Sequence, residues 1–286
     1  MQSQITAAAS GTLTIGGDLE VHRMGYGAMR LTGPGVWGPP EDREDALAVL
    51  RRVVELDVNF IDTADAYGPD VNEEDIAEAL APYARGLVIA TKGGSVRSGP
   101  GQWSGDCRPE RIKQCAEASL KRLKAERIDL YQLHRVDEKV PWEDQVGALK
   151  DLRDAGKIRH AGLSNVSLEQ LMSAEKIVPI VSVQNRYNIA YRDSDPIVDY
   201  CQSKGLAFIP WFPIGGGDAP TAGAMQDAMR AHDASDRQIA LAWLLHRANV
   251  MLPIPGTSSL HHLEENIGAT GIHLSQAEFD ALSAQG

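Results

Sequence analysis

The sequence contains little cysteine, and its three thiols follow no pairing or metal-binding pattern. Cys107, Cys115 and Cys201 are odd in number and show neither CxxC nor CxxH spacing. These features argue against a disulfide framework and against a zinc site. The neighbouring His261 and His262 are also poor metal ligands, because adjacent residues of a helix do not share a face. We therefore expect no bound metal, and three buried or half-buried thiols in a reducing compartment.

Long apolar runs and an excess of positive charge are missing as well. No stretch approaches the roughly 18 consecutive apolar residues of a membrane-spanning helix. The opening MQSQITAAASGTLTIGG has neither the basic start nor the apolar run of a signal peptide. The 28 Lys and Arg against 39 Asp and Glu give a formal charge of −11, which is the wrong sign for binding a nucleic-acid backbone or an anionic membrane. We expect a cytoplasmic protein with neither partner.

Short β-branched runs alternate with amphipathic helical stretches along almost the whole chain. The expected strands are residues 24–29, 59–65, 87–92, 128–134, 158–164, 180–185, 207–212 and 250–255. Eight strand-then-helix units imply a parallel sheet and match the (β/α)8 TIM barrel, an α/β fold in which no strand is left at an edge. Because no linker or low-complexity segment divides the chain, residues 1–286 are expected to form a single barrel domain.

An open, doubly wound sheet is the alternative arrangement. Its dinucleotide-binding fingerprint needs a third glycine, which GYGAMR at residues 25–30 lacks, and no other GxGxxG follows an expected strand. The barrel is therefore preferred. Ahead of the first unit, residues 11–21 alternate around the turn signal Gly16-Gly17-Asp18. This pattern predicts an N-terminal β-hairpin, which we expect to cap the barrel bottom.

Four polar residues follow the expected strands at their carboxyl ends, where barrels of this kind place their active sites. Asp62 and Tyr67 follow the second strand, Lys92 ends the third and His134 ends the fourth. Alone, each has an ordinary structural explanation as a turn carboxylate, a half-buried aromatic, a surface charge or a core histidine. Together they form an acid–base set. Lys92 is expected to lower the pKa of the Tyr67 phenol, Asp62 to keep Lys92 protonated, and neutral His134 to donate to a substrate oxygen.

These residues belong to a series of motifs that resembles the aldo-keto reductases. FIDTADAYG, TKGG, YQLH, GLSN, VQN, WFPIGG and IPGTSSLHHLEEN follow one another in the family's order over nearly the whole chain. The spacing, with GYGAM near the start, is most similar to the bacterial branch that includes pyridoxal-reductase-like members. The resemblance implies a (β/α)8 barrel that reduces aldehydes and ketones with NADPH, with Asp62, Tyr67, Lys92 and His134 as its catalytic tetrad.

An extended nicotinamide cofactor would explain several further residues. Ser164, Asn165 and Gln184 end the fifth and sixth strands, and their side chains are suited to grip the carboxamide, although Ser and Asn also form turns. The resemblance places Trp211 where an aromatic ring stacks on the nicotinamide, with core packing as the alternative. The remaining contacts expected in this part of the cofactor site are Gly27, Ala28, Phe212, Pro213 and the glycines 215–217, whose loop either approaches the pyrophosphate or is simply flexible.

The adenosine end of the cofactor is expected at the start of a late helix, from about Leu260. The exposed amides of a helix N-terminus favour an anion, and the resemblance places the 2′-phosphate beside Gly256, Thr257 and Ser258. The best-known members carry Lys at the position of Gly256 and Arg at that of His262, so the preference for NADPH over NADH is expected to be weaker here. Two further positions, Glu265 and Asn266, align with the family's adenine-contacting pair.

The substrate side is less specified by the sequence. Met29, Trp37, Trp103 and Tyr187 are expected to line an apolar pocket. The chain ends at Gly286, shortly after FDALSA, without the long C-terminal loop of some relatives, which predicts an open mouth. We expect NADPH-dependent reduction of a small-molecule carbonyl with Tyr67 as general acid. The alternatives are an NAD-dependent alcohol or sugar dehydrogenase on the same scaffold, and a slow cofactor-binding redox sensor or regulatory subunit.

Overall fold

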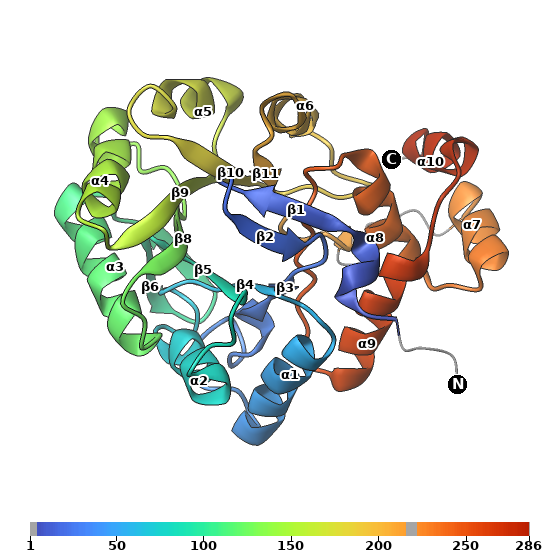
Figure 1. The fold of residues 1–286 in the computed structure, drawn as a ribbon, viewed down its shortest axis with the longest axis horizontal. Helices are drawn as coiled ribbons and strands as arrows, with labels where there is room; N and C mark the ends of the chain where they lie inside the picture. The colour runs from blue at the N-terminus through green and yellow to red at the C-terminus, as the bar shows by residue number, and fades with distance from the viewer. Residues whose placement is uncertain (1–4, 216–221, 286) are drawn as a thin grey trace.

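Seven parallel strands form a curled sheet surrounded by helices (Figure 1), as a computed structural model of residues 5–215 and 222–285 shows. The strands lie in the order β11-β10-β9-β8-β5-β4-β3. In chain order they are β3 (Tyr26–Gly27), β4 (Phe60–Asp62), β5 (Val88–Gly93), β8 (Ile128–Leu133), β9 (Ile158–Ser164), β10 (Ile180–Gln184) and β11 (Ala207–Phe208). Seven of the eight expected strands are therefore confirmed, most of them shorter than predicted.

The eighth expected strand, residues 250–255, closes the barrel with very few hydrogen bonds. Leu252 N donates to Phe208 O at 2.9 Å on one side, and Gly25 N donates to Pro253 O at 2.9 Å on the other. Only a single bridge, between Phe208 and Met251, is formed, since Pro253 and Pro255 have no N–H to extend a ladder. Because this segment joins both edges of the sheet, the predicted (β/α)8 barrel is confirmed and the open sheet is excluded.

The helices cover the outside of the barrel (Figure 1). They are α1 (Arg43–Glu55), α2 (Val71–Leu80), α3 (Pro109–Arg122), α4 (Trp142–Asp154), α5 (Leu168–Ala174), α6 (Asp195–Lys204), α7 (Ala224–His232), α8 (Asp236–Arg247), α9 (Leu260–Gly268) and α10 (Gln276–Ser283). In α1 the buried side chains Leu47, Leu50 and Val53 form one apolar stripe, which is the pattern of a helix packed on a sheet. Asp42 caps this helix by accepting a hydrogen bond from Asp45 N.

Two β-hairpins complete the fold. The first pairs β1 (Thr12–Ile15) with β2 (Leu19–His22) and lies across the barrel opening in Figure 1. Its buried Ile15, Leu19 and Val21 pack with residues from the amino ends of the strands, which confirms the predicted cap. The second pairs β6 (Ser95–Gly99) with β7 (Gln102–Gly105) at the opposite end, and the sequence did not predict it.

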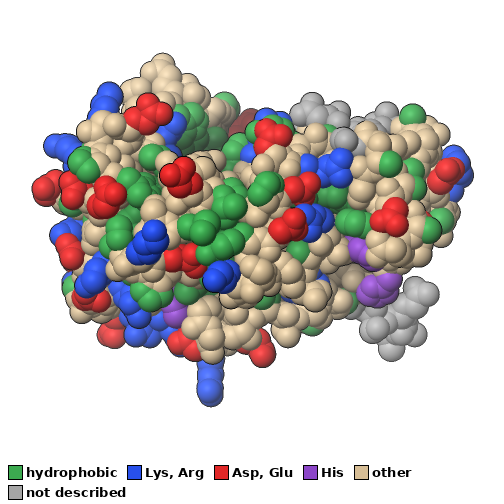
Figure 2. Space-filling model, turned by 90° about the horizontal axis from the view of Figure 1, so that it is seen from above, with side chains coloured by type: hydrophobic (Ala, Val, Ile, Leu, Met, Phe, Trp, Pro, Cys, Tyr) green, Lys and Arg blue, Asp and Glu red, His purple; other side chains and the backbone are tan. Residues whose placement is uncertain are grey.

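The distribution of charged side chains and the state of the cysteines can be described from the structure. Acidic and basic side chains are intermixed on the face shown in Figure 2 rather than gathered into a patch of one sign. Cys107, Cys115 and Cys201 are all buried and free, as expected. None of the helices in the described part of the chain has the length and apolar character needed to cross a bilayer.

Candidate active site

The structure brings together the four residues that the sequence singled out at the carboxyl ends of the strands. Asp62 ends β4, Lys92 is the last residue but one of β5, and His134 directly follows β8. Tyr67 lies on the turn of residues 63–70 after β4. Since these strands are parallel neighbours in the order β8-β5-β4, their carboxyl ends meet at one mouth of the barrel.

Lys92 is the centre of this cluster. Its side chain is fully buried, and Nζ lies 2.5 Å from Asp62 Oδ1. The ammonium also donates to Thr63 O at 2.8 Å and to Tyr67 Oη at 3.3 Å. Burial is the largest single effect and works against the charge, but Asp62 and Tyr67 together outweigh it, and the pKa of Lys92 is raised. Lys92 is therefore a buried cation in contact with the phenol.

Tyr67 corrects one sequence-based expectation. Lys92 does pull the pKa of the phenol down, but burial of the ring is the larger effect and raises it, and Asp62 raises it further. The pKa of Tyr67 is consequently above its ordinary value rather than below it, because a ring only 6% exposed loses most of the water that would stabilise a phenolate. Tyr67 is thus held fully protonated at neutral pH, in contact with a cation ready to stabilise its anion.

His134 is neutral. Burial lowers its pKa well below the ordinary value, and the cations Lys92, Arg135 and Arg97 act in the same direction. Its ring lies edge-on to that of Tyr67, with 5.8 Å between the centroids. Its buried Nδ1 has no hydrogen-bond partner within the described chain, so no protein group shown here fixes the tautomer. A neutral imidazole in this place is able to donate a hydrogen bond to a ligand oxygen.

Two glutamines hold the outer oxygen of Asp62. Gln184 Nε2 donates to Asp62 Oδ2 at 2.8 Å, and Gln132 Nε2 donates to the same atom at 3.2 Å. The side-chain amide of Gln184, which the sequence analysis assigned to the cofactor carboxamide, thus supports the ion pair between Asp62 and Lys92. Gln132 was missed by the sequence reasoning, although it precedes His134 by two residues and so points to the same side of β8 as the histidine. A polar residue at that interior position was the available signal.

The rim next to the tetrad connects three of the expected cofactor residues. Asn165 Nδ2 donates to His134 O and to Ser164 Oγ, each at 3.0 Å. Asn165 Oδ1 accepts a hydrogen bond from Trp211 Nε1 at 3.0 Å. Asn165 holds this position with a φ of +59°, which asparagine tolerates better than most residues. Ser164, Asn165 and Trp211 therefore form one continuous edge beside His134.

The chain after Trp211 forms the next part of the rim. Phe212 is 37% exposed, and its carbonyl accepts a hydrogen bond from Asn188 Nδ2 at 3.0 Å. Pro213 and Gly215 follow, with the φ of Gly215 at +75°, whereas Gly216 and Gly217 lie outside the described residues. An exposed aromatic ring followed by glycine suits a surface that covers a ligand.

The start of α9 lies where the barrel is closed. The helix begins at Leu260, as predicted, with Ser259 as its N-cap. A Cβ on Gly256 would lie 2.4 Å from Gly27 O, and a Cβ on Gly27 would lie 2.7 Å from Ile254 O. Both positions thus require glycine, which gives a physical reason for the absence of lysine at 256. Ala28, the residue after Gly27, is fully buried.

The residues around α9 that were expected to contact the adenosine differ in burial and in hydrogen bonding. Tyr26 Oη donates to Thr257 O at 2.5 Å, which fixes the loop before the helix, and the exposed His262 lies in its first turn. Glu265 Oε1 accepts a hydrogen bond from Ser235 Oγ at 2.6 Å, and Asn266 is buried.

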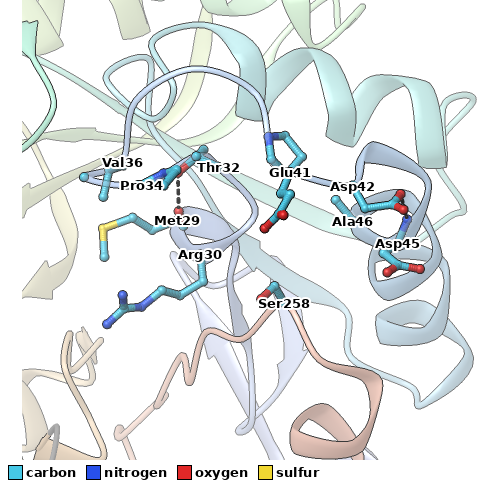
Figure 3. Close-up of a pocket in the computed structure, with 13 residues that line it drawn as sticks. Met29, Arg30, Thr32, Pro34, Val36, Glu41, Asp42, Asp45, Ala46 and Ser258 are labelled. Atoms are coloured by element: carbon cyan, nitrogen blue, oxygen red, sulfur yellow. Dashed lines mark hydrogen bonds between the residues drawn. The ribbon is translucent and has the colours of Figure 1, made fainter.

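A cavity of about 750 Å³ lies between this region and the start of α1. Met29, Arg30 and Ser258 line one side, while Glu41, Asp42 and Asp45 lie toward α1 (Figure 3).

The substrate mouth contains two of the expected aromatic residues. Trp103 lies 6.3 Å from the ring of Tyr67 and 6.1 Å from that of His134, in edge-on orientations. The ring of Trp37 lies 5.9 Å from Arg97 Cζ. Tyr187, by contrast, was wrongly assigned to the pocket. It is fully buried, stacks on Trp243 and donates to Asp195, because the residues after β10 turn back into the core.

Residues 23–285 match the model of the Aldo/keto reductase family. The chain belongs to this family. Among its relatives, a Schizosaccharomyces pombe protein named as an oxidoreductase is 48% identical over 285 residues, covering 99% of this chain and 92% of the relative. Pyridoxine 4-dehydrogenase of Escherichia coli is 41% identical over 280 residues, covering 96% and 98%.

Solved structures share the fold of this aldo-keto reductase. A thermostable aldo-keto reductase in complex with the inhibitor epalrestat superposes with a TM-score of 0.84 at 28% identity, covering 96% of this chain and 99% of that one. An aldo-keto reductase from Klebsiella pneumoniae, crystallised with NADP and acetate, has a TM-score of 0.79 at 23% identity, with 96% and 94% covered.

Proposed function

We propose that this aldo-keto reductase reduces small aldehydes and ketones with NADPH, using Tyr67 as the proton donor. The observation that carries the proposal is the contact of Lys92 Nζ with both Asp62 Oδ1 at 2.5 Å and Tyr67 Oη at 3.3 Å, next to neutral His134. Structural ion pairs also occur in barrels, but this buried pair touches a phenol at the barrel mouth that has no other hydrogen bond within residues 5–215 and 222–285, which is the arrangement of an acid catalyst.

The described residues fit a nicotinamide cofactor. The edge formed by Ser164, Asn165 and Trp211 offers hydroxyl, amide and aromatic groups beside His134, and the buried Nδ1 of His134 has no partner among the residues that the structure describes. When bound, the cofactor supplies the hydride. The exposed Ser258 and the half-buried Thr257 before α9 are the groups we assign to its 2′-phosphate, and the structural neighbour that holds NADP supports this cofactor.

The proton step follows from the chain's own residues. Neutral His134 donates a hydrogen bond to the carbonyl oxygen and holds it near Tyr67 Oη. Where negative charge would develop on that oxygen during reduction, Tyr67 is placed to give it a proton. The phenolate that remains is stabilised by the Lys92 ammonium, which Asp62 and the two glutamines keep in position. Burial excludes water from this exchange.

A steady-state assay of the purified chain tests the proposal. We expect oxidation of NADPH by 4-nitrobenzaldehyde to be catalytic and saturable in aldehyde. Tight cofactor binding without turnover would favour the regulatory alternative. Faster reaction with NAD and an alcohol would favour the dehydrogenase. We also propose that the protein acts in the cytoplasm, where its three free thiols would stay reduced.

A second candidate concerns the substrate. The relative named pyridoxine 4-dehydrogenase is 41% identical over nearly all of this chain, which favours a hydroxymethyl pyridine and its aldehyde as the substrate pair. Comparing kcat/KM for pyridoxal and for 4-nitrobenzaldehyde tests this candidate. A ratio near one would show that the mouth does not select the substituted pyridine ring.

A further inference from the structure

Arg97 joins three backbone segments at the barrel mouth. It lies on β6, and all five of its N–H groups donate to backbone carbonyls. The acceptors are Gly35 O and Val36 O at 2.6 Å, Ala66 O at 3.1 Å, Gly99 O at 3.3 Å and Gln102 O at 3.0 Å. They belong to the loop of residues 33–38, the turn that carries Tyr67, and the β6–β7 hairpin itself.

These contacts give Arg97 a geometric role. Its five hydrogen bonds go to neutral backbone oxygens, so its donors are already used and are not available to a substrate anion. A planar fork that spans three segments fixes their relative positions more strictly than a lysine would. Arg97 is therefore the residue that holds the mouth together.

The flat face of the same guanidinium supports an aromatic wall. Arg97 Cζ lies 3.7 Å above the ring of Trp103 and 5.9 Å from that of Trp37. Trp103 in turn lies edge-on to Tyr67 and His134 and remains 38% exposed. The exposed part of this indole is thus held beside the proton donor by a cation on its face.

We propose that Arg97 is a positioning residue that sets substrate specificity, by holding Trp103 as a preformed wall that favours carbonyls attached to a flat aromatic ring. The inference rests on the proposed carbonyl reduction and deepens it. An indole that is already ordered loses little freedom when a substrate stacks on it, so binding is not weakened by an ordering cost. A small aliphatic aldehyde does not reach the indole and gains nothing from this order.

The test compares benzaldehyde with propanal. In Arg97→Met we expect the KM for benzaldehyde to rise on the order of tenfold more than the KM for propanal, with any change in kcat shared by the two aldehydes. Arg97→Lys, which keeps the charge but loses the fork, should show most of the same KM increase. Arg108→Met is the matched control, because Arg108 is an exposed arginine that pairs with Asp106 just beyond the same hairpin, and it should change neither KM.

Coupling to Trp103 separates this role from a general structural one. Trp103→Ala should raise the KM for benzaldehyde as Arg97→Met does, and the double variant should be no worse than either single variant. Independent, multiplying effects of the two substitutions would overturn the proposal. So would equal increases in KM for both aldehydes, or a loss confined to 4-carboxybenzaldehyde, which would make Arg97 an anion-binding residue.

A binding measurement keeps this inference distinct from the proposed function. Quenching of tryptophan emission by 4-nitrobenzaldehyde in the NADP-loaded protein reports aldehyde binding without turnover. We expect the dissociation constant to rise on the order of tenfold in both Arg97 variants. If the chain reduces no aldehyde, the proposed function fails while this experiment still decides the role of Arg97. An unchanged constant in a folded Arg97→Lys would overturn that role.

Discussion

Tyr67 and Lys92 show how burial and charge compete at one atom. The cation pulls the pKa of the phenol down, yet the ring is buried so deeply that the pKa ends above its ordinary value. The group is then a stable acid before reaction, and its conjugate base is stabilised only where Lys92 touches it. In the proposed reaction, the acid strength that Tyr67 needs would therefore appear when charge develops on the substrate oxygen.

Removing the phenol hydroxyl tests the acid directly. Tyr67→Phe should reduce the rate of carbonyl reduction on the order of 10² or more, because the proton donor is lost. The Kd for NADPH should stay within a few-fold, since the ring remains. Steady-state kinetics and a fluorescence titration measure the two quantities. Near-full turnover in the Phe variant would contradict the assignment.

The ion pair has its own prediction. Lys92→Met leaves Asp62 buried and without its cation, so we expect lower stability as well as a lower rate. The double variant Asp62→Asn with Lys92→Met should recover part of the stability but none of the activity, because the orphaned charge is gone and the cation is still missing. Thermal melts and single-turnover rates of both single variants and the double decide this. Strictly additive melting losses would mean that the two residues are not coupled.

Site residues could be predicted from the sequence where they belong to a recognisable motif. Asp62, Tyr67, Lys92 and His134 were found from their positions after strands. Gln132 and Arg97 were not, because a glutamine or an arginine alone does not reveal which oxygens it will meet. Tyr187 was misplaced because the turn after β10 directs it inward, and nothing in the local pattern indicates that turn.

At the scale of elements, the start of α9 is the proposed site of the cofactor 2′-phosphate, and its groups would set how well that phosphate is held. It offers hydroxyls and helix amides, without the fixed cations of better-known relatives. His262→Arg should therefore widen the preference for NADPH over NADH by about tenfold, as a charge-assisted contact replaces neutral ones. His261→Arg is the control, because the adjacent residue points elsewhere on the helix. The ratio of the two Kd values, from tryptophan fluorescence, measures the effect. Equal changes in both variants would contradict a specific contact.

Helices and strands with a regular hydrophobic pattern could be predicted from the sequence. Elements whose position depends on contacts with distant segments could not. The amphipathic helices and β5, β8, β9 and β10 follow from patterning within the segment. The closing segment at 250–255 has the composition of a strand, but its prolines limit it to one bridge. The β6–β7 hairpin was missed because Ser95–Gly105 is rich in small polar residues, and its position depends on Arg97 reaching other segments.

At the scale of the whole molecule, a buried carboxylate should make stability depend on pH. Asp65 is 6% exposed, its Oδ1 has no partner within the described chain, and burial raises its pKa to about 7. Its pKa in the unfolded chain is about 3.9. Between these values the folded state binds more protons than the unfolded one, so the free energy of unfolding falls as pH rises from about 4 to about 7 and stays reduced above that.

Asp65→Asn removes this dependence. As pH rises from about 5 to about 8, we expect the variant to become more stable than the parent, by on the order of a few kcal/mol in unfolding free energy. Its melting temperature should rise relative to that of the parent over the same range. Thermal melts across this range measure the gain. Asp280→Asn, at an exposed carboxylate that accepts from Gln276, is the control and should show no such trend. A constant difference between parent and Asp65→Asn would contradict the raised pKa.

The close approach of Gly256 to the Gly27 carbonyl has a consequence for how the chain folds during its synthesis. These glycines lie more than two hundred positions apart in the sequence yet touch through the Gly27 carbonyl, and the expected cofactor contacts lie on both sides of them. A nascent chain therefore cannot assemble the complete nucleotide site until residues 250–262 have left the ribosome. Long-range closure of this kind is slow compared with local folding. A nucleotide that binds only the closed form would add its binding free energy to the last step of folding.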